Sequence, residues 1–174
     1  LYALAAYSQR KSPDDFSSLT DFFPTYPASR WAGSLLANLG IIYRRTGYYS
    51  EAMDAWNRAW EILKNDNEPK VKALADRVVS ELLLMNAWVG NVNRIDSLFK
   101  EIDNRIIEGP AEPQVLVMRG ALWTMKNIPG TSFKCGPYAL DEIYLLKDSS
   151  HAKREKLMSV QSTSKGFSLR ELEN

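Results

Sequence analysis

Cys135 is the residue best placed for covalent chemistry in this sequence. It follows Lys134 and precedes Gly136-Pro137, at the expected start of a helix. A thiol just before a helix with a proline in its first turn lies near unpaired backbone N–H groups and the positive end of the helix dipole. These groups and the lysine charge favour a thiolate. Cys135 is therefore a candidate nucleophile. The alternative is a small packed residue, since free cysteines are among the most buried side chains.

A nucleophilic thiol needs a base that activates or orients it. The chain has one histidine, His151, and only a short predicted helix separates it from Cys135. We interpret His151 as a surface or helix-capping residue rather than as that base. The segment around Cys135 should therefore not turn over substrate by itself.

Metal and cofactor chemistry is not expected from this sequence. One cysteine and one histidine cannot form an intrachain disulfide or the usual four-ligand zinc site. The chain also has no glycine-rich phosphate loop, no His-Glu-x-x-His motif, no calcium loop and no Gly-x-Ser-x-Gly motif. We predict no metal site and no cofactor.

The composition is that of a folded protein with balanced charge. The 174 residues include 22 Lys and Arg and 21 Asp and Glu, which leaves a net charge of +1. This balance argues against a nucleic-acid partner or an anionic membrane surface, because proteins that bind either concentrate positive charge. No apolar run reaches the roughly eighteen residues of a membrane span. Five Trp and eight Tyr are better explained by packing than by base stacking.

Helical spacing of apolar residues runs through almost the whole chain, and Pro and Gly fall between the periodic stretches. We therefore expect an all-α protein. The expected helices cover 1–9, 12–23, 29–45, 50–64, 71–89, 95–102, 115–125, 137–147 and 152–158, with a last one after Ser168. Ser12 and Ser29 are the predicted N-caps of the second and third, and Ser168 with Glu171 forms a capping box. The apolar start at Leu1 suggests a piece of a longer protein.

Small and large apolar residues follow a fixed pattern on the two helices within 33–66. They are Leu36, Leu39, Gly40 and Tyr43 on the first helix, and Gly47, Tyr49, Ala52, Trp56 and Ala59 on the second. This pattern resembles the tetratricopeptide (TPR) family. A glycine inside a helix costs about 1 kcal/mol relative to alanine. We therefore expect Gly40 and Ala52 to allow close helix contact while Tyr43 and Trp56 fill the remaining space.

Two weaker units flank this repeat. One has Gly90 at its turn and Ile95 and Phe99 in its later helix, and the other ends near Tyr26-Pro27. Three units meet the minimum for a stable stack. We predict a TPR-like stack of antiparallel hairpins over 1–129 and a less regular helical segment over 130–174.

The TPR resemblance implies a concave face that binds a peptide or a protein partner. The matching positions on the clear repeat are Asn38, Ile41, Arg44 and Arg45. The alternative is a solvated helix face, on which two arginines near the negative end of the helix are favourable in any case.

The segment after the predicted repeats resembles a second family. Phe133, Cys135-Gly136-Pro137 and Ala139-Leu140 are similar to the nucleophile segment of papain-like cysteine peptidases that process bacteriocin leaders, and 166–172 resembles a second short helix of that fold. The resemblance implies that 130–174 begins such a domain, with Cys135 as nucleophile. Two features differ: 127–134 lacks the family's glutamine, and the family's histidine would lie beyond residue 174.

Two functions are consistent with these patterns. The first is a TPR-like interaction scaffold within a larger bacterial protein. The second is the N-terminal part of a cysteine peptidase that uses Cys135. The sequence identifies neither the partner, the oligomeric state nor the compartment.

Overall fold

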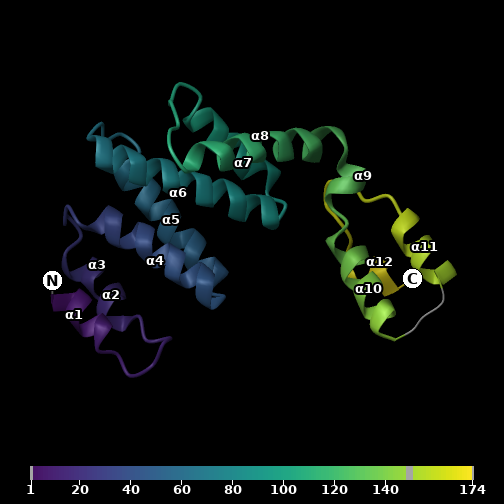
Figure 1. Ribbon diagram of the computed structural model, residues 1–174, viewed down its shortest axis with the longest axis horizontal. Helices are drawn as coiled ribbons and strands as arrows, with labels where there is room; N and C mark the ends of the chain where they lie inside the picture. The colour runs from purple at the N-terminus through teal and green to yellow at the C-terminus, as the bar shows by residue number, and fades with distance from the viewer. Residues whose placement is uncertain (1, 148–150, 174) are drawn as a thin grey trace. The chain divides into compact units, whose positions relative to one another are not determined.

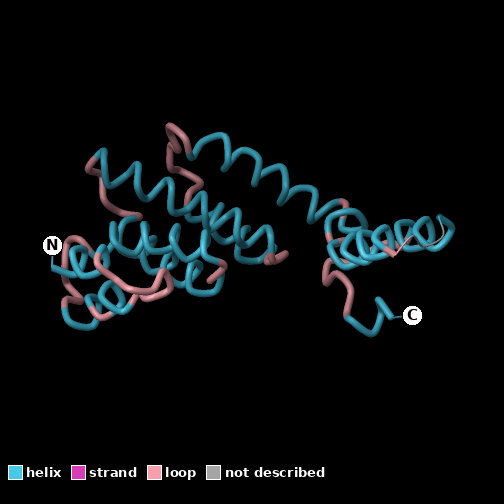
Figure 2. The backbone as a smooth tube through the Cα atoms, turned by 60° about the horizontal axis from the view of Figure 1, so that its bottom comes forward, coloured by secondary structure: helices cyan, strands magenta, loops and turns pink. Residues whose placement is uncertain are grey.

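The computed structural model describes residues 2–147 and 151–173, and the elements in these ranges are helices joined by loops (Figures 1 and 2). They are α1 Tyr2–Ser8, α2 Ser17–Thr20, α3 Phe22–Thr25, α4 Ala32–Thr46, α5 Tyr49–Leu63, α6 Pro69–Trp88, α7 Val92–Glu101, α8 Ala111–Asn127, α9 Pro129–Ser132, α10 Cys135–Leu146, α11 His151–Ser159 and α12 Leu169–Glu173. The β structure of the described part is limited to an isolated bridge between Thr163 and Gly166. The predicted all-α class is confirmed.

The chain forms two compact units. The first comprises Leu1–Met85 and Arg105–Val115, and the second comprises Asn86–Asn104 and Leu116–Asn174. The predicted boundary near Pro129 lies inside the second unit. Among the described residues, no helix is both long and apolar enough to cross a bilayer.

In the first unit, α4 and α5 form a closely packed hairpin and lie side by side in Figure 1. Gly47 allows the turn because its φ of 88° is in the left-handed region. A Cβ built on Gly40 would lie 2.6 Å from Trp56 Cδ1, so only glycine admits that ring. The Trp56 indole donates a 3.0 Å hydrogen bond to the carbonyl oxygen of Ala37. Ala52, Tyr43 and Trp56 are buried, which confirms the predicted contact.

The segment from 12 to 25 differs from the single helix predicted there. Ser12 does not begin a helix. Instead, the Asp15 carboxylate accepts bonds from Ser17 N and Oγ at 3.1 and 2.6 Å, and two short helices, α2 and α3, follow. Pro24 lies within α3 rather than ending the helix before it. The apolar positions are nevertheless buried as expected: Phe16, Leu19 and Phe23.

A buried ion pair joins the 105–115 segment to α6 in the first unit. Asp76 is 1% exposed, and Arg105 Nε donates to its Oδ1 at 2.6 Å. Lys72 Nζ donates to the other carboxylate oxygen at 2.9 Å, and Arg105 also donates to the carbonyl oxygen of Lys64. A buried charge is tolerated when it is paired and hydrogen-bonded in this way.

In the second unit, polar contacts cap one helix and connect two others. Asn91 Oδ1 accepts from Arg94 N and caps α7. Arg154 on α11 donates to both carboxylate oxygens of Asp141 on α10, at 2.7 and 3.1 Å. These hydrogen bonds hold the pKa of Asp141 below its usual value.

The last described helix has the predicted capping box. Ser168 N and Oγ both donate to Glu171 Oε2, at 2.8 and 2.7 Å, and Glu171 N donates to Ser168 Oγ. Helix α12 therefore begins directly after Ser168, where the sequence placed it.

Candidate functional site: an aromatic groove

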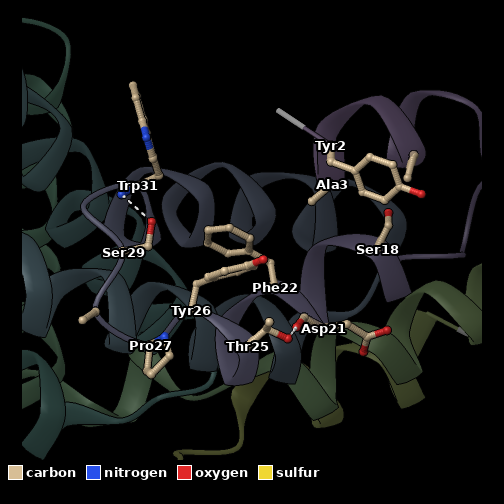
Figure 3. A pocket seen from close by; sticks show the side chains of 12 residues that line it. Tyr2, Ala3, Ser18, Asp21, Phe22, Thr25, Tyr26, Pro27, Ser29 and Trp31 are labelled. Carbon is tan, nitrogen blue, oxygen red and sulfur yellow. Dashed lines mark hydrogen bonds between the residues drawn. The ribbon is translucent and has the colours of Figure 1, made fainter.

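A groove lined by exposed aromatic rings lies in the first unit, where α1, α2, α3 and the loop before α4 meet (Figure 3). Its volume is about 830 Å³. Its lining residues are Tyr2, Ala3, Ala6, Ser18, Asp21, Phe22, Thr25, Tyr26, Pro27, Ala28, Ser29 and Trp31. We call this surface the aromatic groove.

Two neighbouring rings form the centre of the aromatic groove. The ring centroids of Phe22 and Tyr26 lie 5.2 Å apart and their planes are tilted by 38°. In Figure 3 this pair lies between Trp31 on one side and Tyr2 on the other. Tyr26 is 58% exposed and Trp31 60%. The exposed faces of these rings therefore offer apolar surface that a partner can contact.

Local hydrogen bonds position these rings. Tyr26 N donates to the carbonyl oxygen of Phe22 at 2.9 Å and ends α3, so both rings project from one helical turn. Ser29 Oγ accepts from Trp31 N at 3.2 Å and fixes the start of α4, as the dashed line in Figure 3 shows. The Arg30 guanidinium lies 5.2 Å from the Trp31 ring centroid and further restricts the indole.

Polar groups surround the rings and remain available to a ligand. Asp21 is exposed, and its carboxylate has no partner among the described residues; Thr25 Oγ1 donates to its backbone carbonyl oxygen instead, at 2.7 Å. The Tyr26 and Ser18 hydroxyls likewise have no partner within 2–147 and 151–173. The aromatic groove can therefore contact apolar groups through its rings and accept N–H donors at its edge.

The four residues predicted for the concave face occupy two environments. Ile41 is buried, and Arg44 Nη1 lies 2.9 Å from Glu81 Oε2 on α6. The buried Glu81 Oε2 accepts no well-aligned hydrogen bond, so this contact is an ion pair. Asn38 and Arg45 are exposed, and Asn38 Nδ2 donates to the carbonyl oxygen of Ser34 within its own helix. Binding of a partner at these positions stays a prediction, and Asn38 and Arg45 are the two that a partner could reach.

Cys135 is the first residue of α10 and its side chain is exposed. The preceding Lys134 is buried and donates from Nζ to the carbonyl oxygen of Met158. A Cβ on Gly136 would lie 2.8 Å from Leu172 Cδ1, so the start of α10 contacts α12 closely. The side chain of His151 lies outside the described part of the chain. The described residues contain no cluster of groups able to hold a metal ion.

The aromatic groove is not predicted by the sequence pattern, because aromatic residues in a helical protein are expected to pack in the core. A signal was present: Phe22, Tyr26 and Trp31 fall in a stretch interrupted by Pro24 and Pro27, where no helical periodicity continues. Aromatic residues in such a stretch have fewer neighbours to bury them.

No family model, curated protein or solved structure matches the chain.

Proposed function

We propose that the chain is an interaction module in which a stack of helical hairpins presents the aromatic groove to an extended, proline-containing segment of a partner protein. The observation that carries this proposal is the exposure of Tyr26 and Trp31 around the Phe22 ring in a preformed hollow. Folded proteins rarely expose contiguous apolar surface of this kind without using it.

The chemistry of the groove favours an extended peptide over a charged small molecule. Aromatic rings set along a shallow groove bind polyproline II segments, which are already extended and lose little conformational entropy on binding. The exposed Asp21 carboxylate at the edge fits a basic residue next to the prolines. The ligand that best matches both features is a proline-containing segment with one arginine.

Titration calorimetry with a synthetic decapeptide of prolines and leucines, carrying one arginine, tests this proposal. We expect Trp31→Ala and Tyr26→Ala each to weaken binding by about tenfold, which corresponds to about 1.4 kcal/mol. Trp88→Ala is the matched control, since Trp88 is equally exposed on α6 but outside the aromatic groove. The proposal would be contradicted if the unmodified chain, both groove variants and the Trp88→Ala control bound the peptide with equal affinity.

The sequence pattern of α4 and α5 resembles the TPR family, and this resemblance supports the same class of function. The α4–α5 packing around Gly40 and Trp56 gives a stiff support for the α3–α4 loop that carries Trp31. Phe16 extends that support, because its ring lies 4.7 Å from the Tyr43 ring on α4. A preformed support lowers the ordering cost that binding must overcome.

A cysteine peptidase is the second candidate function. It is favoured by the exposed Cys135 thiol at the first residue of a twelve-residue helix. In this proposal the base comes from a segment outside the chain. Iodoacetamide labelling at pH 6 tests the thiol: an activated Cys135 would react several times faster than glutathione, and a rate equal to that of glutathione would remove this candidate.

A further inference from the structure

The exposed face of α8 repeats the residue spacing with which α4 packs against α5. On both helices a leucine, a glycine and an aromatic residue follow at intervals of four and three positions. The α4 set is Leu36, Gly40 and Tyr43, and the α8 set is Leu116, Gly120 and Trp123. Residues at these intervals lie on one side of a helix. The α8 set therefore forms a single stripe, which we call the α8 face.

The two glycines differ in what they contact. A Cβ on Gly40 would collide with Trp56, because α5 fills the notch that the glycine leaves. A Cβ on Gly120 would meet no atom of the described residues within 4 Å. On either side of this open notch, Leu116 is 60% exposed and Trp123 59%. The α8 face thus has the residues of a helix-packing surface, and no helix of the described part of the chain covers it.

Positive charge runs along one edge of the α8 face. The Arg119 guanidinium lies 4.6 Å above the Phe99 ring, and no carboxylate within 2–147 or 151–173 pairs with it. Lys126 contacts Asp96, but Asp96 also accepts from Lys100, so two cations share one carboxylate. The edge is therefore net positive, and a complementary partner carries acidic residues.

We propose that the α8 face docks an amphipathic helix of a partner protein, with an aromatic side chain over Gly120 and an acidic flank beside Arg119. Helix α5 shows the required chemistry within the same chain. It places Trp56 over Gly40, and it carries three acidic residues and one arginine. The α8 face shares no residue with the aromatic groove, so this inference stands whether or not the groove binds peptide.

A peptide with the sequence of α5 is the probe for this site. A short helix is only marginally formed in water, so the peptide is stapled on its solvent face and labelled with fluorescein. We expect saturable binding to the full chain by fluorescence anisotropy. The peptide variant Trp56→Ala should bind about tenfold more weakly, because it lacks the ring for the notch, and added salt should weaken binding of the unmodified peptide.

Gly120→Leu in the full chain closes the notch without a steric conflict, since the site is open, and it should weaken peptide binding by about tenfold or more. Glu142→Leu is the matched control, because it adds the same side chain to an exposed position on α10. Circular dichroism verifies that both variants are folded. Saturable binding lost only in Gly120→Leu supports the proposal.

Three results would overturn it. The first is an absence of saturable binding up to about 1 mM peptide, and the second is binding that Gly120→Leu does not change. The third is a concentration-dependent dimer in sedimentation velocity that Gly120→Leu dissociates, which would assign the α8 face to a second copy of the chain.

Discussion

Alanine at Gly40 and alanine at Gly120 should change stability in opposite directions. Both glycines lie inside helices, so alanine contributes about 1 kcal/mol of helix propensity at each. At Gly40 the new methyl group would lie 2.6 Å from Trp56 Cδ1, and overpacking of a core costs about 1–3 kcal/mol. Displacement of the indole would also break its hydrogen bond to Ala37, at a further cost of about 1 kcal/mol.

The net expectation is a loss of about 1–3 kcal/mol for Gly40→Ala and a gain of up to about 1 kcal/mol for Gly120→Ala. Thermal unfolding followed by circular dichroism measures both. For a chain of this size, about 1 kcal/mol corresponds to a shift of about 2–4 °C in Tm. A rise in Tm for Gly40→Ala would contradict this expectation, because it would mean that the indole of Trp56 does not occupy the notch.

Three further predictions concern polar contacts. Arg105→Ala leaves the buried Asp76 without its closest partner and should lower the urea midpoint by the equivalent of about 3–5 kcal/mol; a change under about 1 kcal/mol would show that the pair is dispensable. Hydrogen bonds from Arg154 lower the pKa of Asp141 in the folded protein, so ionised Asp141 stabilises the fold. This stabilisation is fully present above the pKa of an unfolded aspartate, about 3.9, and it is lost as the pH falls below that value. Amide exchange of α11 should therefore accelerate below about pH 4, and Asp141→Asn should remove this dependence. Asn91→Ala removes the cap of α7 and should cost about 1 kcal/mol, measured as faster amide exchange in its first turn.

The long helices could be predicted closely from the sequence because their apolar spacing is regular. The prediction of 29–45 and 50–64 for α4 and α5 is accurate to within about three residues at each end. The Gly40–Trp56 contact was also predictable, since a glycine inside a helix needs a compensating close neighbour. Both results depend on patterns within one hairpin.

Contacts between distant segments could not be predicted in this way. Arg44 pairs with Glu81 on another helix, and nothing in the local pattern around Arg44 indicates that partner. The error over 12–23 has a local cause: the Asp15 carboxylate bonds to Ser17 and begins a short helix that competes with the longer one predicted from Ser12. The aromatic groove depends on how α1, α3 and the loop before α4 meet, which only the folded unit shows.

The most direct test of the proposed interaction module is a two-dimensional ¹H–¹⁵N spectrum of the chain titrated with the proline-containing decapeptide. We expect the indole signal of Trp31 to move in proportion to the peptide bound, while the signal of the buried Trp56 stays in place. A titration in which the Trp31 signal does not move, or in which the shifts map to Asn38 and Arg45 instead, would contradict it.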